Sequence, residues 1–206
     1  MDKPTEQPDG KPANHNPLYP IFLKLHKLRL LVVGAGEVGY EKLSFILKSS
    51  PDAVVHVVAP EVKEDVAALL ERLPDHRVTV SLRPFETSDV EGFDLAIAAT
   101  NFPELNREVQ AACKAAGVLV NVADTPDLCD FYLGSVVTRG NLKVAISTNG
   151  TSPTLAKRMR QLLEEVLPEE SDELLSNLKA IRDRLKGGFE EKVKQLNDLT
   201  ASLLEE

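Results

Sequence analysis

Short apolar segments alternate with amphipathic segments from residue 29 to residue 122 of the chain. The apolar segments are rich in β-branched residues and nearly continuous in hydrophobic positions, which is typical of strands buried on both faces of a parallel sheet. We expect five such strands, at residues 29–33, 53–58, 77–81, 94–99 and 118–122. Helical periodicity predicts helices between most of them, at residues 38–48, 61–72 and 103–116. The alternation predicts an α/β fold, a doubly wound parallel sheet of the Rossmann type.

The pattern changes after residue 124. Two further apolar segments, residues 131–139 and 142–148, are joined by Gly140 and Asn141, which is compatible with a β-hairpin. A helix should follow, with Ser152 at its N-cap and Pro153 at its first position. Two more amphipathic helices are expected on either side of Gly187 and Gly188. The chain therefore divides into a tail, a sheet domain, a small hairpin and helix region and a helical tail, at residues 1–17, 18–124, 125–168 and 169–206.

Charge and composition exclude several classes of function. The net charge is −8, of which residues 164–206 contribute −6 through 12 acidic and 6 basic side chains. This acidic balance argues against nucleic-acid binding. No apolar run approaches the roughly 20 residues that span a membrane, and the polar, proline-rich start does not resemble a signal peptide. Two cysteines without a CxxC pair suggest neither a disulfide scaffold nor a zinc site. A cytoplasmic protein is expected.

A complete G-x-G-x-x-G motif lies at Gly34, Gly36 and Gly39, directly after the first predicted strand and at the start of a helix. In this context the first glycine permits a tight turn, the second lets the backbone approach a pyrophosphate, and the third allows close packing of helix on strand. The N-terminus of the helix offers backbone N–H donors to an anion. The motif predicts a dinucleotide-binding site.

Two further loops follow strands of the same sheet. Glu61 lies just beyond the second strand, where an acidic residue binds the ribose hydroxyls of NAD, although it can equally be a first-turn helix residue. No arginine for a 2′-phosphate is present in this loop, so NAD is preferred over NADP. Thr100 and Asn101 follow the fourth strand and are expected to contact the ligand, with capping of the next helix by Asn101 as the alternative.

A carboxylate lies just beyond the fifth predicted strand. Asp124 comes after the apolar run 118–122 and precedes Thr125 and Pro126. Many such residues cap the next turn, because a carboxylate is costly to bury. The choice between a turn cap and a functional carboxylate depends on the rest of the chain.

Four motifs in order resemble the precorrin-2 dehydrogenase family, the N-terminal module of siroheme synthases. They are "YPIFLKLHKLRLLVVGAGEVGYEKL", "FDLAIAATNFPELN", "VNVADTPDLCDFYLGSVV" and "LKVAISTNGTSPTLAKRMR", and together they span roughly residues 18–168. The resemblance implies NAD-dependent oxidation of precorrin-2 to sirohydrochlorin. It places NAD contacts at Glu37, Val38, Pro60 and Glu61, and an essential aspartate, a possible general base, at Asp124. It also implies a homodimer formed through the region of residues 125–168, with the substrate cleft near the interface.

The resemblance also suggests how a tetrapyrrole that carries many carboxylates is bound by an acidic chain. Its binding is expected at Ser152, at the start of the helix, and at the basic residues Lys157, Arg158 and Arg160, which are otherwise a solvated helix face. Thr148 stands where some members carry a serine, so any regulatory role at that position is in doubt. Two alternatives stay open. The first is a bifunctional enzyme that also inserts Fe²⁺ into sirohydrochlorin, although the sequence has no recognisable metal-binding motif. The second is a module that senses NAD without turnover.

Overall fold

The computed structural model describes residues 16–73, 77–168 and 171–200, so most of the predicted tail of residues 1–17 lies outside the described residues. The chain forms two compact units by its internal contacts. The first comprises residues 1–132 and 149–151, and the second residues 133–148 and 152–206. Within the described parts, no helix is long and apolar enough to cross a membrane.

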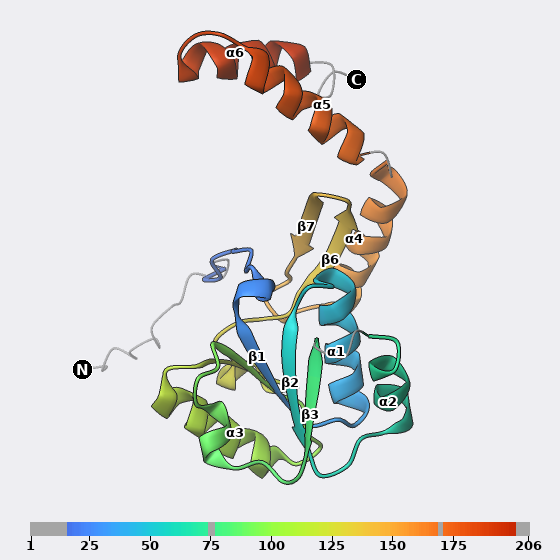
Figure 1. Ribbon diagram of the computed structural model, residues 1–206, viewed down its shortest axis with the longest axis vertical. Helices are drawn as coiled ribbons and strands as arrows, with labels where there is room; N and C mark the ends of the chain where they lie inside the picture. The colour runs from blue at the N-terminus through green and yellow to red at the C-terminus, as the bar shows by residue number, and fades with distance from the viewer. Residues whose placement is uncertain (1–15, 74–76, 169–170, 201–206) are drawn as a thin grey trace, which may run out of the picture. The chain divides into compact units, whose positions relative to one another are not determined.

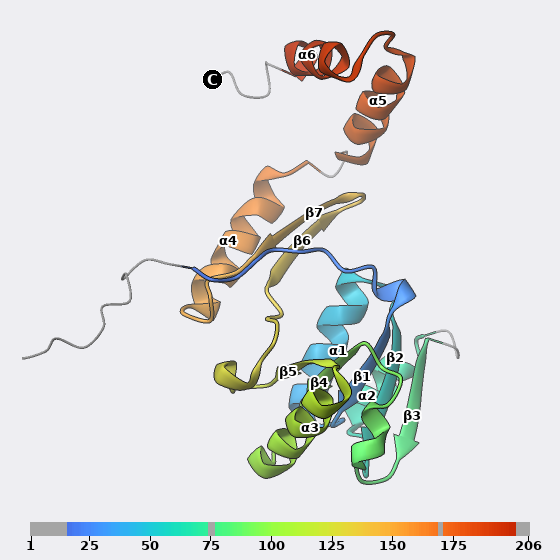
Figure 2. The same cartoon turned by 90° about the vertical axis from the view of Figure 1, so that its left-hand side faces the viewer.

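The first unit is built on a parallel sheet of five strands in the order β3-β2-β1-β4-β5. Figure 1 labels β1, β2 and β3 of this sheet, and Figure 2 labels all five strands. The strands are β1 (Arg29–Val33), β2 (Val54–Ala59), β3 (Val78–Leu82), β4 (Leu95–Ala98) and β5 (Leu119–Val122). All four pairings are parallel. The predicted strands and the predicted doubly wound topology are therefore confirmed. No strand end differs from its predicted position by more than one residue.

Helices cover both faces of this sheet. Figure 2 shows α3 on one face, with α1 and α2 on the other. Their bounds are α1 (Glu37–Ser49), α2 (Glu64–Leu70) and α3 (Pro103–Ala116). Short 3-10 helices complete the unit: η1 (Leu25–Lys27), η2 (Thr87–Val90) and η3 (Pro126–Leu128).

The core lies between the sheet and these helices. The central strands β1 and β4 are nearly all apolar and buried, and Leu31, Val32, Ala96 and Ile97 are at most 1% exposed. Burying a side chain of the size of valine or leucine contributes about 1.5–3 kcal/mol, so the central strands dominate the stability of the unit. Burial on both faces explains why these strands are continuous in apolar residues rather than alternating.

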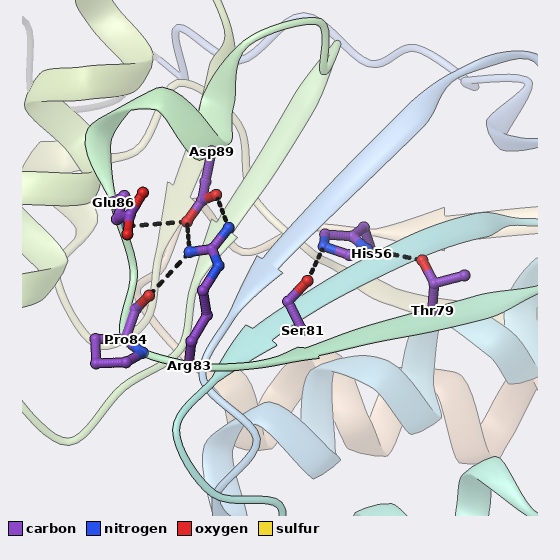
Figure 3. A network of polar contacts seen from close by, with 7 residues as sticks. All are labelled: His56, Thr79, Ser81, Arg83, Pro84, Glu86 and Asp89. Carbon is purple, nitrogen blue, oxygen red and sulfur yellow. Dashed lines mark hydrogen bonds and ion pairs between the residues drawn. The ribbon is translucent and has the colours of Figure 1, made fainter.

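The outer end of the sheet is held by polar contacts (Figure 3). His56 of β2 has its two ring nitrogens 2.7 and 3.1 Å from the hydroxyls of Thr79 and Ser81 on β3. Beyond β3, Arg83 forms a two-pronged ion pair with Asp89, and Asp89 also accepts a hydrogen bond from the backbone of Glu86 at 2.9 Å. These contacts hold the segment from the end of β3 to η2 in place.

The second unit contains a hairpin and the helices that follow it. Strands β6 (Ser135–Arg139) and β7 (Leu142–Ile146) pair antiparallel, which confirms the predicted hairpin at Gly140 and Asn141. The helices are α4 (Pro153–Val166), α5 (Ser171–Arg184) and α6 (Phe189–Thr200). Ser152 is the N-cap of α4, as predicted, and its hydroxyl accepts a hydrogen bond from the amide of Leu155 at 3.2 Å.

Candidate functional site

The glycine motif forms the connection between β1 and α1. Gly34 adopts φ +109°, and a Cβ atom there would collide with the carbonyl of Ala99 at the end of β4. A Cβ atom at Gly39 would collide with the carbonyl of Gly34. The first and third glycines are therefore required by packing within the protein itself, as the motif predicts.

Gly36 differs from its two neighbours because a Cβ atom at this position would meet no atom within 4 Å. It is the N-cap of α1, without a side-chain cap, and its φ of −86° is accessible to any residue. The absence of a side chain therefore has no explanation within the first unit. This open approach to the backbone suits a ligand group, and the first amides of α1, at Glu37 and Val38, can donate to an anion there. These residues fit the pyrophosphate of a dinucleotide.

The loop after β2 lies beside the glycine loop. The backbone amide of Lys63 donates a hydrogen bond of 3.1 Å to the carbonyl of Ala35. Pro60 and Glu61, which precede Lys63 in this loop, are both exposed. Glu61 precedes α2, which starts at Glu64, so its side chain is not part of the first turn of that helix. This placement leaves the Glu61 carboxylate available at the predicted ribose position.

The loop after β4 is held by a residue that the sequence reasoning missed. Asn106 of α3 is 6% exposed, and its amide oxygen accepts hydrogen bonds from the amide and hydroxyl of Thr100 at 3.2 and 2.7 Å. Its amide nitrogen donates to the Thr100 carbonyl at 3.0 Å. The N-cap of α3 is Phe102, so the alternative that Asn101 caps the helix is wrong. The available signal was an asparagine in the buried helix stripe that continues with Val109 and Cys113.

Asp124 lies at the same edge of the sheet as the glycine loop. Strand register aligns Val33 with Ala98, and Ala98 with Val122. Gly34 and Asp124 therefore leave neighbouring positions at the carboxyl edge, separated by the single strand β4. With strands about 4.8 Å apart, the ends of β1 and β5 are about 10 Å from each other, and Asp124 is the second residue after β5. This is the edge at which ligands of open α/β sheets bind.

The side chain of Asp124 is exposed, and its backbone takes the left-handed conformation, with φ +57°. Aspartate tolerates this conformation better than most residues, but it is still uncommon outside glycine. Across the parts of the chain that the structure describes, the Asp124 carboxylate has no hydrogen-bond or ion-pair partner. Its interpretation as a simple turn cap therefore lacks the contact that a cap would make.

The predicted substrate residues Ser152, Lys157, Arg158 and Arg160 all belong to the second unit. The Ser152 hydroxyl serves as the helix cap, and Arg160 pairs with Glu164 at 2.5 Å. Lys157 and Arg158 are exposed, and Arg158 donates to the amide oxygen of Gln161 at 3.1 Å. The binding of substrate by these residues stays a prediction.

The described part of the chain shows no candidate site for a metal ion. No group of three or more histidine, cysteine, aspartate or glutamate side chains there is arranged to hold a metal ion. Of the four histidines, His26 and His56 are among the described residues, and His15 and His76 are not.

Comparison with known proteins identifies two segments of the chain. Residues 21–135 match a family described as "Putative NAD(P)-binding", and residues 139–165 match "Sirohaem biosynthesis protein central". The first match covers more than half of the chain and confirms the predicted nicotinamide-dinucleotide cofactor.

Related sequences agree with this assignment. The chain is 38% identical over 170 residues to the siroheme synthase of Nitrosomonas europaea, and 37% identical over 172 residues to that of Methylococcus capsulatus. These alignments cover 82% and 84% of this chain and 35% of each relative. The chain thus spans about a third of the length of these siroheme synthases.

Among solved structures, one described as "SirC, precorrin-2 dehydrogenase" has the same fold, with a TM-score of 0.68. It is 24% identical in sequence, and the alignment covers 88% of this chain and 89% of that one. The likeness confirms the predicted fold, a parallel sheet followed by a hairpin and helices.

Proposed function

Because this chain belongs to the NAD(P)-binding family that its residues 21–135 match, we propose that it oxidises precorrin-2 to sirohydrochlorin with NAD as the oxidant. The observation that carries the proposal is the shared edge of the sheet, where Asp124 lies one strand away from the glycine loop. The siroheme synthase relatives point to a tetrapyrrole as the substrate.

The reaction removes a hydride and a proton from the macrocycle. Bound NAD supplies the hydride acceptor. The backbone at Gly36 and the first amides of α1 hold the pyrophosphate, and Glu61 accepts hydrogen bonds from the ribose, which favours NAD over NADP. Holding the two reactants in one geometry supplies much of the rate acceleration, because it removes the entropic cost of bringing them together.

Asp124 is the proposed general base. A carboxylate that takes up the proton while the hydride leaves contributes typically 10²–10⁴-fold to the rate. The described contacts leave its oxygens unengaged, so they are available to the substrate. Asp124 and Glu61 are each the second residue after a strand at this edge, β5 and β2, and Glu61 is assigned to the ribose.

Binding of the carboxylate-bearing substrate is assigned to α4. Lys157 and Arg158 lie near the N-terminus of this helix and are exposed, so their charges are available for carboxylates. Arg139 is used differently: its guanidinium donates to the carbonyls of Glu164 and Leu167 at 2.5 and 3.4 Å and so caps the C-terminus of α4. Arg139 is therefore not proposed as a substrate ligand.

A homodimer through the second unit is also proposed. Leu155, Met159, Leu162 and Val166 form a stripe on α4 that stays exposed in the single chain. Their spacing of four, three and four residues is that of a helix–helix seam, and a second copy can cover the stripe symmetrically. Sedimentation should show a dimer that Leu162→Glu converts to monomers, whereas Gln161→Glu beside it should not. A monomeric wild-type protein would contradict this part of the proposal.

The protein is expected to act in the cytoplasm.

The direct test is absorbance during incubation of the protein with precorrin-2 and NAD. Formation of sirohydrochlorin together with reduced nicotinamide supports the dehydrogenase. Binding of NAD without any oxidation of precorrin-2 would overturn it and favour an NAD-sensing module. A second incubation, of sirohydrochlorin with Fe²⁺ as substrate, tests the bifunctional alternative. Iron insertion above the uncatalysed rate, and dependent on Asp124, would add that activity.

A further inference from the structure

Both ends of the turn that carries Asp124 form hydrogen bonds with one sulfur atom, Sγ of Cys129. Sγ of Cys129 lies 3.2 Å from both the backbone nitrogen and the carbonyl oxygen of Val122, the last residue of β5. It also lies 3.4 Å from the carbonyl oxygen of Thr125, the first residue after Asp124. A thiol is a weak hydrogen-bond donor and acceptor. Through these contacts the Cys129 thiol connects Val122, before Ala123 and Asp124, with Thr125, after them.

The same segment closes the free edge of β5. Because β5 is the last strand of the sheet, its outward backbone groups lack a neighbouring strand. Asp130 supplies two partners: its carboxylate accepts from the amide of Val120 at 3.0 Å, and its own amide donates to the Val120 carbonyl at 2.8 Å. The buried side chain of Asn121 donates to the carbonyl of Phe131 at 2.8 Å. Residues 129–131 are therefore anchored to the strand, and Cys129 is held where it meets the turn.

The backbone at Asp124 needs such support. A left-handed conformation at a residue other than glycine is strained, and it persists only where the surroundings hold it. The remaining contacts across the turn are single hydrogen bonds, from the Thr125 amide to Val122 and from the Thr125 hydroxyl to Ala123, both at 3.3 Å. The half-buried thiol provides the additional link.

We propose that Cys129 is a positioning residue: its thiol ties the end of β5 to Thr125 and so holds Asp124 in the left-handed conformation that presents its carboxylate at the nucleotide-binding edge. The inference deepens the proposed function, since it rests on Asp124 acting in the reaction. Burial raises the pKa of Cys129, with the nearby Asp130 carboxylate acting in the same direction, so the sulfur is a protonated thiol that can donate to a carbonyl.

The chain provides a matched control for this role. Cys113 is fully buried in α3 and belongs to the same apolar core that Cys129 packs against. Cys113→Ala removes a core sulfur and leaves the contacts around Asp124 in place. Cys129→Ala removes a sulfur together with those contacts, and Cys129→Ser restores a hydroxyl that can partly replace them.

Kinetics of the variants give the first readout. Cys129→Ala should lower kcat about ten- to a hundredfold, the scale expected for a misplaced reacting group, and leave KM for NAD within about twofold. Cys129→Ser should recover part of the loss, and Cys113→Ala should keep the wild-type kcat at lower stability. In the background of Asp124→Asn, Cys129→Ala should cause no further loss, because both act through one group. A wild-type kcat in Cys129→Ala would overturn the inference. So would a double variant in which Cys129→Ala lowers kcat by the same factor as it does in the wild-type protein.

A second readout does not depend on turnover. The NMR coupling between the amide and Hα protons of Asp124, with the matching nuclear Overhauser effects, reports its φ angle. It should change in Cys129→Ala and stay as in the wild type in Cys113→Ala. If the wild-type protein does not oxidise precorrin-2, the proposed function fails, and an unchanged φ in Cys129→Ala still refutes the positioning role on its own.

Discussion

The side chain of Asn106 makes three hydrogen bonds with a single residue, Thr100, at the carboxyl end of β4. Thr100 in turn lies against the first glycine of the nucleotide loop, since a Cβ atom at Gly34 would come within 3.1 Å of its side-chain methyl. The buried amide thus fixes the loop that borders the glycine motif.

Replacing Asn106 tests this connection. Asn106→Ala leaves the backbone amide and carbonyl of Thr100 without their partners, so it should destabilise the protein by about 1–3 kcal/mol. It should also raise KM for NAD several-fold, because the loop beside Gly34 is no longer fixed. Urea denaturation and NAD titration measure the two effects. Glu108→Ala, an exposed change on the same helix, is the control, and equal NAD affinity in both variants would contradict the connection.

Gly36 gives a prediction that separates binding from folding. Gly36→Ala should leave the melting temperature unchanged, because the new Cβ meets no protein atom and the backbone angles suit alanine. It should weaken NAD binding at least about tenfold, or ~1.4 kcal/mol, because the methyl group occupies the approach to the pyrophosphate. Gly34→Ala should instead unfold the loop. Wild-type NAD affinity in Gly36→Ala would show that the dinucleotide does not approach this backbone.

The Arg83–Asp89 pair predicts an acid-dependent contribution to stability. The hydrogen-bonded Arg83 guanidinium lowers the pKa of Asp89 below its ordinary value of 3.8, against the opposing effect of its burial. A depressed pKa in the folded state stabilises the protein above the unfolded value, and the stabilisation disappears as the pH falls below about 3.8. Asp89→Asn should therefore be less stable than the wild type at pH 7, and the difference should shrink in acid. A difference independent of pH would contradict this assignment.

The raised pKa of Cys113 predicts that stability decreases with rising pH in the alkaline range, whereas the Asp89 contribution is lost with falling pH. Burial, with a smaller contribution from the Asp130 carboxylate, raises the pKa of its thiol from 9.0 to about 11. Above pH 9 the unfolded chain loses this proton and the folded protein keeps it, so stability falls as the pH rises towards 11, by an amount on the order of 2 kcal/mol. Denaturation curves of Cys113→Ala should lack this part of the decline. An identical decline of stability with pH in Cys113→Ala and in the wild-type protein would refute the raised pKa of the Cys113 thiol.

Local patterns were sufficient for the fold and for the nucleotide loop. Apolar continuity predicts β1 and β4 because each is buried on both faces, and the glycine spacing predicts Gly34 and Gly39 because backbone packing requires them. Ser152 and Pro153 predict the start of α4 for the same reason, since capping acts within a few residues.

Contacts that form only once the elements are packed together could not be predicted in this way. Asn106 appears as an ordinary helix residue until β4 is placed beside it, and Arg139 appears as a free cation until the end of α4 reaches it. The left-handed backbone of Asp124 depends on Cys129, five residues further on, in a segment that periodicity cannot describe. These contacts arise from the tertiary structure, and the sequence shows only that polar residues are present.

The central claim is that Asp124 performs the proton transfer at a site that binds NAD independently of it. Asp124→Asn is the sharpest variant, because asparagine has the same shape, accepts the left-handed backbone and cannot act as the base. Single-turnover oxidation of precorrin-2 by this variant, with NAD binding measured in parallel, should show a rate at least about a hundredfold lower and NAD affinity within about twofold of the wild type. A wild-type rate in Asp124→Asn would contradict the account.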